Sequence, residues 1–289
     1  MSEGPAGGSV TGPGEHPADA LARAARALRQ SLLFERAFGR DVTITWSPLA
    51  PIQEAPQAAA AVAAREGAHI AAAQHFREDL ALPEDLDAER LRRLAILDPL
   101  RQEVLRCTAC VLCQQRTQAV FGVGDPCARL LFVGEGPGEE EDRQGEPFVG
   151  KAGQLLTRMI QAMGLERRDV YIANIVKCRP PGNRNPEPRE IISCMPYLRR
   201  QIEVIRPQVI CALGNVAARS LLETPTSISR LRGHFAEALG IPVMPTFHPS
   251  YLLRNPEDKR LAWMDLRKLM DFLGLHDPRS SGGGPGEDR

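Results

Sequence analysis

The chain of 289 residues lacks any long hydrophobic run. No apolar stretch approaches the roughly 20 residues that a helix needs to cross a bilayer, and the N-terminus lacks the apolar core of a signal peptide. We therefore expect a cytoplasmic protein without membrane contact. Lysine is scarce as well, with 4 lysines against 32 arginines. This bias is consistent with phosphate binding or with a GC-rich genome.

A net charge is also missing, because 36 basic residues balance 36 acidic ones. The charges are nevertheless spread unevenly. Residues 1–104 carry 11 basic and 15 acidic side chains, whereas residues 165–275 carry 17 basic and 11 acidic ones. The C-terminal half could therefore present a basic face to nucleic acid, and a mixed solvated surface explains the same counts.

A complete phosphate-binding loop is the third feature that the chain lacks. Residues 145–152 read GEPFVGKA and nearly match the P-loop pattern G-x4-G-K-[ST]. Ala152 stands where that pattern needs a hydroxyl for magnesium, and charged residues rather than a strand precede Gly145. The pattern argues against a nucleoside triphosphatase.

The chain divides into three parts by composition. Residues 1–95 are interpreted as an N-terminal extension, because they contain a Gly/Pro/Ser-rich start and an Ala/Pro-rich linker, with periodicity that allows helices over 17–38, 58–74 and 87–106. Residues 96–275 are interpreted as the functional domain, and residues 276–289 as a flexible tail. No chemistry is assigned to the extension.

Strand-like and helix-like segments alternate along the domain. This alternation predicts an α/β fold of three layers, α/β/α, around a central, mostly parallel sheet. The expected strands are 128–133, 170–176, 209–214 and 243–247, and the expected helices are 154–163, 187–205, 216–222 and 258–273.

The loop 134–153 connects the first of these strands to the first helix. It contains six glycines and four consecutive acids. Glycine allows the backbone to approach a ligand closely, and open α/β sheets bind ligands beyond the carboxyl ends of their strands. The loop is predicted to be part of a binding site.

Seven cysteines in a cytoplasmic chain are expected to bind metal or to be buried rather than to form disulfides. Cys107 and Cys110 form a C-x2-C pair, and Cys178 with Cys194 could complete a set of four. Cys113 extends the first pair toward a ferredoxin-like run, but position 117 is Thr. Four thiolates suit zinc or an iron–sulfur cluster, and their spacing does not choose between the two.

Three long motifs resemble the family 4 uracil-DNA glycosylases, the iron–sulfur branch found in bacteria and archaea. They are GEGPGEEEDRQGEPFVGKAGQLL from Gly134, YIANIVKCRPPGNRNP from Tyr171 and FHPSYLLRNP from Phe247. The resemblance covers about residues 107–273 and excludes residues 1–95. It implies a uracil-DNA glycosylase-like fold and a DNA repair hydrolase that flips uracil out of DNA and cuts its N-glycosidic bond, leaving an abasic site.

The resemblance also implies a cofactor. The family's cluster ligands map onto Cys107, Cys110, Cys178 and Cys194, and the group would be a 4Fe–4S cluster with a structural role. The cluster would hold DNA-facing loops in place.

Three side chains are expected to handle the base. Phe148 would stack on the flipped uracil, and Asn174 would read it, because an amide can donate to O4 and accept from N3–H. His248 would donate a hydrogen bond to O2 as negative charge develops there. Main-chain N–H groups of Glu135 and Gly136 would hold the pyrimidine edge.

The sequence does not identify the residue that positions the attacking water. Better-known uracil glycosylases carry an aspartate where this chain has Gly136. Glu135 and Glu141 are the candidate acids that would orient water or stabilise the sugar cation, and a solvated acidic face is the alternative for both.

Contacts to DNA, single- or double-stranded, are expected at two places. The basic residues Lys177, Arg179 and Arg184 would bind phosphate, and Leu252, Leu253 and Arg254 would press into the duplex. A related branch that traps the abasic sugar carries a histidine within the segment that corresponds to residues 177–188. This chain has none there, so hydrolytic turnover is expected.

Three other functions remain open from the sequence. They are an electron-transfer protein, a non-catalytic DNA-binding or polymerase-associated adaptor, and a zinc-dependent hydrolase. A monomer is expected for an enzyme that scans DNA.

Overall fold

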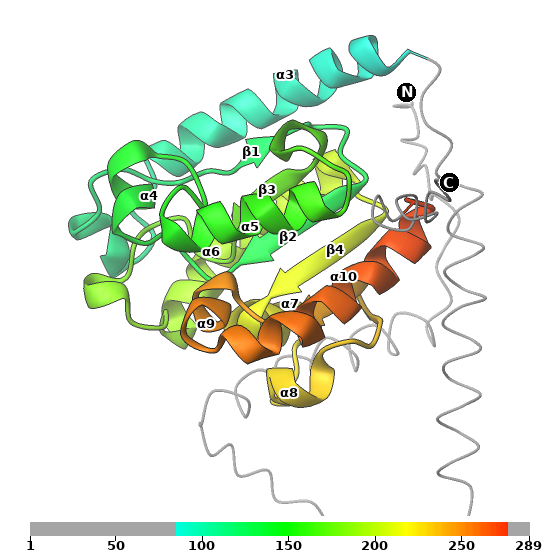
Figure 1. Ribbon diagram of the computed structural model, residues 1–289. Coiled ribbons are helices and arrows are strands. Elements are labelled where there is room, and N and C mark those ends of the chain that lie inside the picture. The colour runs from blue at the N-terminus through cyan, green and yellow to red at the C-terminus, as the bar shows by residue number, and fades with distance from the viewer. Residues whose placement is uncertain (1–84, 277–289) are drawn as a thin grey trace, which may run out of the picture. The chain divides into compact units, whose positions relative to one another are not determined.

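Helix α3 (Leu86–Leu105) opens the part of the chain that the computed structural model describes, residues 85–276 (Figure 1). Asp85 begins the helix, because its carboxylate accepts the N–H groups of Asp87 and Ala88. The helix expected at 87–106 is therefore confirmed, and it runs through the domain boundary proposed at residue 95. The other helices expected in the extension, and the tail after residue 276, lie outside the described residues.

The sheet has four parallel strands at its centre, as predicted. These are β3 (Tyr171–Asn174), β2 (Leu130–Gly134), β4 (Val209–Leu213) and β6 (Ile241–Thr246), in that spatial order. Short strands β1 (Val123–Gly124) and β5 (Ala236–Ala238) pair antiparallel with β3 and β6 at the two edges. Every residue of β2, β3 and β4 is buried, which explains their continuous apolar sequences.

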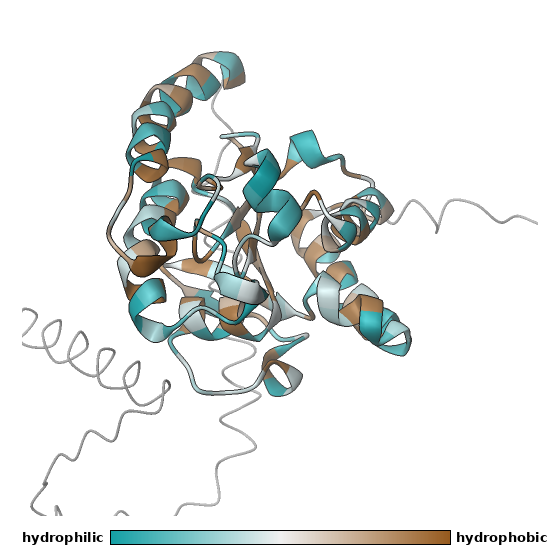
Figure 2. Ribbon diagram, turned by 90° about the vertical axis from the view of Figure 1, so that its left-hand side faces the viewer, coloured by the Kyte–Doolittle hydropathy of each residue, from teal (hydrophilic) through white to brown (hydrophobic). Residues whose placement is uncertain are grey.

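Helices cover both faces of the sheet. Helices α5 (Lys151–Ala162), α9 (Pro249–Arg254) and α10 (Lys259–Leu273) share one apolar core with β2, β4 and β6, and α5 and α10 lie in front of the sheet in Figure 1. Helices α6 (Pro188–Ile205) and α7 (Gly214–Leu222) belong to the other side, where α3 packs on α6. Helices α5, α6, α7 and α10 are amphipathic, as one-sided packing requires. Figure 2 shows apolar and hydrophilic residues interspersed along the helices.

The remaining elements are short, and the sequence did not predict them. Helix α4 (Glu139–Gln144) has no apolar stripe; its four acids occupy the first turn, where they complement the helix dipole. The edge strands are too short to show a period. The others are η1 (Val111–Gln114), η2 (Arg167–Asp169), η3 (Pro181–Asn183), α8 (Ile228–Leu231) and η4 (Pro256–Asp258).

The chain order creates a switch point at the carboxyl edge of the sheet. From β2 the chain moves outward to β3, and from β4 it moves the other way to β6. Loops that leave adjacent strands in opposite directions open a crevice for ligands. No helix among residues 85–276 is long and apolar enough to cross a membrane.

Candidate functional site

Asn174 ends β3 and lies beside Gly134, the last residue of β2. The side chain is 1% exposed, yet neither its Oδ1 nor its Nδ2 has a hydrogen-bond partner within the described residues. A buried amide without partners is costly and calls for a functional explanation. A Cβ on Gly134 would lie 2.5 Å from Oδ1 of Asn174, so the glycine leaves room for this amide.

Phe148 reaches the same place from the loop before α5. A Cβ on Gly134 would also lie 2.5 Å from the end of its ring. The backbone of Phe148 has a φ of 55°, which is unusual outside glycine. Arg167 holds this conformation by donating to the carbonyls of Pro147 (2.9 Å) and Phe148 (3.2 Å). Gly153 allows α5 to lie close to this backbone, because a Cβ at that position would clash with the carbonyl oxygen of Phe148.

His248 begins α9 and brings a third side chain to the edge. Its ring centroid lies 5.6 Å from that of Phe148. The backbone N–H of Ser250 donates to Nδ1 (3.2 Å), and the Ser250 hydroxyl lies 2.7 Å from the same atom. Nδ1 is thus the acceptor, which leaves the proton on Nε2. Burial, and then the charge of Arg254, lowers the pKa of His248 to about 4, so the ring is neutral at pH 7.

The two candidate acids have different surroundings. Burial alone raises the pKa of Glu135 to about 7, and no side-chain partner accounts for the shift. The Glu141 carboxylate instead accepts the N–H groups of Val149 and Gly150, both at 2.9 Å, and that of Gly138 at 3.1 Å. These bonds hold the start of α5, and with it the loop that carries Phe148.

Two predicted DNA contacts are wrong. Lys177 is 1% exposed, and its ammonium donates to the carbonyl of Asn174 (3.0 Å) and to Gln201 (2.6 Å). Burial lowers its pKa to about 8, which leaves it mainly protonated at neutral pH. Leu252 is part of the core with α5 and α10 and cannot enter a duplex.

The other predicted DNA contacts are accessible to different degrees. Leu253 is 39% exposed, and Arg254 beside it is exposed. Arg179 is half-buried and bonds Asn183, with Glu139 3.6 Å away. Arg184 makes a bidentate bond (2.6 and 2.8 Å) with the buried Glu190, so its guanidinium is largely engaged.

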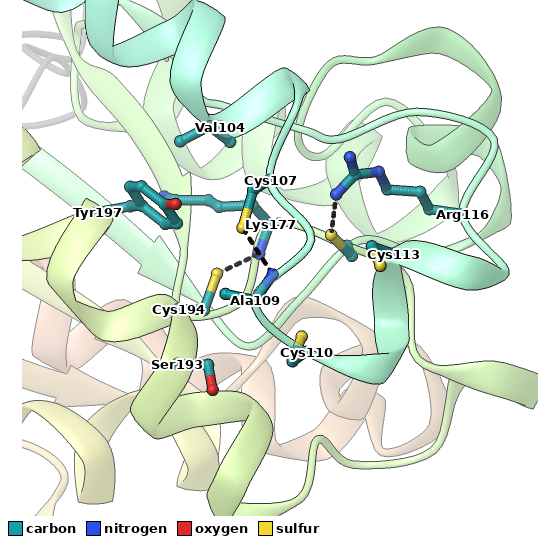
Figure 3. A pocket seen from close by; sticks show the side chains of 11 residues that line it. Val104, Cys107, Ala109, Cys110, Cys113, Arg116, Lys177, Ser193, Cys194 and Tyr197 are labelled. Atoms are coloured by element: carbon teal, nitrogen blue, oxygen red, sulfur yellow. Dashed lines mark hydrogen bonds between the residues drawn. The ribbon is translucent and has the colours of Figure 1, made fainter.

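Five cysteines line one pocket between the end of α3, the loop after β3 and helix α6 (Figure 3). They include all four predicted ligands, namely Cys107, Cys110, Cys178 and Cys194, together with Cys113. Among the residues that the structure describes, no group of three or more His, Cys, Asp or Glu side chains is arranged to hold a single metal ion. The thiols therefore surround a hollow instead of meeting at one point.

Donors point at three of these sulfurs. The N–H groups of Ala109 and Lys177 donate to Cys107 (3.4 Å) and Cys194 (3.2 Å), and the Arg116 guanidinium donates to Cys178 (3.0 Å). Such donors stabilise thiolates, which are the form that ligates iron. The donor set fits the implied cluster.

Several residues that support the site escaped the sequence analysis. Arg167 and Gln201 bond residues that are far away in the sequence, and the bond from Ser250 to His248 depends on side-chain orientations that a sequence does not show. Ser250 alone had a signal, because it follows His248 by two residues within the third motif. Asp142 is a further case: it is buried, and it accepts the N–H of Thr117 (2.9 Å), which joins α4 to the cysteine segment.

Comparison with known proteins agrees with this geometry. The family model of the uracil DNA glycosylase superfamily matches residues 121–267. A type-4 uracil-DNA glycosylase of Thermotoga maritima is 47% identical over 185 residues, which are 63% of this chain and 96% of that protein. Enzymes of the same name from Sulfurisphaera tokodaii (45% identity; 61% and 84% covered) and Archaeoglobus fulgidus (42%; 63% and 96%) are similar. The chain belongs to the type-4 uracil-DNA glycosylase family.

Proposed function

We propose that the protein removes uracil from DNA by hydrolysing its N-glycosidic bond, as the first step of base excision repair. The buried, unpaired amide of Asn174 carries this proposal. An extruded uracil offers an acceptor at O4 and a donor at N3–H, which match Nδ2 and Oδ1. Cytosine presents the opposite pattern and does not match the amide in this orientation.

Phe148 and His248 complete the base site. The Phe148 ring lies against Gly134 between the two polar side chains and offers a rigid surface for stacking. His248, neutral and protonated at Nε2, donates to O2 as the glycosidic bond breaks and charge moves onto the base. A fixed donor of this kind contributes about 10²–10³ to the rate. Backbone N–H groups of Glu135 and Gly136 are proposed to hold the pyrimidine edge.

Glu135 is the better candidate for the water. Its pKa of about 7 provides a carboxylate near neutral pH, which can accept a proton from the attacking water or stabilise the sugar cation. Glu141 already accepts three backbone N–H groups, so we assign it the placement of the Phe148 loop.

The DNA would lie across the carboxyl edge. Leu253 is the proposed wedge, and Arg254 and Arg179 are the proposed phosphate contacts, with double- or single-stranded DNA as substrate. Arg184 would act indirectly by fixing Glu190 at the start of α6. The enzyme is proposed to work as a monomer in the cytoplasm.

The cysteine pocket is proposed to hold a 4Fe–4S cluster through Cys107, Cys110, Cys178 and Cys194. When bound, the cluster would cross-link the end of α3, the loop after β3 and α6, and it would take no part in bond cleavage. Support comes from the hollow between the thiols and from the donors at the sulfurs.

The test is base release from an end-labelled duplex with one U·G pair, followed by alkali, which cuts at abasic sites. We expect a cut at the uracil position for wild type and for His234→Ala, a control in an exposed histidine. His248→Ala and Asn174→Ala should each lose about 10²–10³ in rate. If iron-loaded wild type binds the duplex but produces no cut, the result would instead support the non-catalytic adaptor.

A further inference from the structure

Lys177 is buried, and its ammonium and its backbone contact different parts of the site. Its ammonium donates to the backbone carbonyl of Asn174 (3.0 Å) and to Oε1 of Gln201 (2.6 Å). Gln201 is itself fully buried and anchored, because its Nε2 donates to the carbonyl of Phe121 (2.9 Å). The ammonium is therefore held in one place.

The backbone of Lys177 belongs to the cysteine pocket. Its N–H donates to Sγ of Cys194 (3.2 Å), its carbonyl accepts the N–H of Val120 (2.7 Å), and Cys178 follows directly in the chain. Figure 3 shows the backbone N–H of Lys177 directed at the sulfur of Cys194, while the side chain leads away from the sulfurs. One residue thus contacts both a proposed cluster ligand and the strand end that carries the proposed base reader.

The charge of Lys177 needs a counterpart. Within residues 85–276 no ion pair to a carboxylate is found for it, and burying an uncompensated cation is costly. Four thiolates that hold an iron–sulfur cluster are net negative, and Cys194 is in direct contact. A cluster bound there would place negative charge next to the backbone of this lysine.

We propose that Lys177 is a positioning residue that couples the cluster to base recognition. Its N–H and its charge stabilise the cluster side, and its ammonium fixes the carbonyl of Asn174 where β3 ends, so that the amide of Asn174 stays aligned with the base. This inference rests on the function proposed above. It also explains why a lysine is buried where a phosphate contact was expected.

A double-mutant cycle tests the coupling. Single-turnover rates of uracil release are measured for Lys177→Met, Asn174→Ala and the double variant. Misplacing a reading group by about 1 Å costs roughly 10²-fold, so Lys177→Met should lose about 10- to 100-fold. In the Asn174→Ala background the same change should cost little, because the group that it positions is gone. Losses that simply multiply would overturn the coupling.

Lys268→Met is the matched control. Lys268 also donates an ammonium–carbonyl bond, to Gly233 at 2.6 Å, but it contacts neither the cysteine pocket nor Asn174. It should leave the rate unchanged. If Lys177→Met fails to fold, Gln201→Leu replaces it in the cycle, since it removes one of the two acceptors of the ammonium. Its smaller loss should likewise vanish beside Asn174→Ala.

The reduction potential of the cluster gives a readout that a merely structural role would not move. Removing a nearby cation disfavours the reduced, more negative cluster, so Lys177→Met should lower the midpoint potential while Lys268→Met leaves it unchanged. If the potential is unchanged and the rate losses of the two variants simply multiply, this inference is overturned but the proposed function is not. Wild type that releases no uracil would overturn the proposed function itself, and wild type that holds no iron would overturn the proposed cluster.

Discussion

Asn174 is the residue at which stability and function conflict most clearly. Its Oδ1 and Nδ2 are buried without partners, so the folded protein bears their desolvation cost. We predict that Asn174→Leu leaves the free energy of unfolding in urea unchanged or higher, while uracil release falls by about 10²-fold or more.

A second buried amide provides the comparison. Gln201 is bonded at both ends, to Lys177 and to Phe121. Gln201→Leu should therefore lose about 1–3 kcal/mol of stability, because it leaves the buried partners unpaired. If Asn174→Leu were equally destabilising, the amide of Asn174 would have partners in solution, and the argument for a base reader would lose its basis.

Glu135 makes a prediction about pH. Burial raises its pKa from 4.5 to about 7, so its carboxylate form increases as pH rises through about 7. Uracil release should rise about tenfold per pH unit below that value and level off above it. His248, with a pKa of about 4, stays neutral over this range and adds no step. Glu135→Gln should abolish the rise and lower the plateau by about 10²–10⁴.

Stability should follow the opposite course. An unfolded glutamate ionises near pH 4.5, before the folded one, so wild type loses free energy of unfolding relative to Glu135→Gln as pH rises from about 4.5 to 7. Glu141→Gln is the control for the rate profile, because its remaining carbonyl oxygen still accepts N–H groups. If the rate still rises with pH in Glu135→Gln but no longer rises in Glu141→Gln, Glu141 would be the acid that handles the water and Glu135 would not.

At the scale of elements, α9 carries two adjacent leucines with different roles. Leu252 belongs to the core with α5 and α10, whereas Leu253 is 39% exposed. Leu252→Ala should lose about 2–5 kcal/mol of stability in urea. Leu253→Ala should change stability by less than about 0.5 kcal/mol and slow uracil release from duplex far more than from single strands. Equal rate losses on both substrates would contradict the wedge.

Elements with a strong pattern were predictable, and elements that depend on remote partners were not. The apolar runs of β2, β3 and β4 are buried on both faces, so composition alone revealed them. Helix α4 has no apolar stripe, and its Glu141 side chain is held by the N–H groups of Val149 and Gly150, which lie 8 and 9 residues further along the chain. Only tertiary context shows these contributions.

The same distinction applies to the site. The family resemblance assigned Asn174, Phe148 and His248 to one site, and the structure brings the three side chains to one edge of the sheet, because loops that follow parallel strands meet there. Lys177 and Leu252 were misjudged because sequence shows that a side chain is basic or apolar but not which way it points. Lys177 points toward Gln201, which lies 24 residues further along the chain.

At the scale of the whole molecule, the cysteine pocket joins segments that are far apart in sequence. It connects the end of α3 to the loop after β3 and to α6. The chain that follows Cys113 is bonded to α4 through Thr117 and Asp142, and the loop after β3 reaches the base site through Lys177. Loss of the proposed cluster is therefore expected to change the position of Asn174 as well as the segments that carry the cysteines.

The last prediction separates ligands from bystanders in this pocket. If the proposed 4Fe–4S cluster is present, Cys178→Ser should lower iron content by removing a proposed ligand, whereas Cys113→Ser should keep iron and the visible absorbance of wild type, although Cys113 lines the same pocket. Hydrogen exchange completes the measurement. In Cys178→Ser, or after iron chelation, amides in residues 105–118 and 175–194 should exchange faster while those of β4 and β6 remain protected, because the apolar core holds the sheet without metal. Iron loss in Cys113→Ser would instead make Cys113 a ligand and require a different set of four.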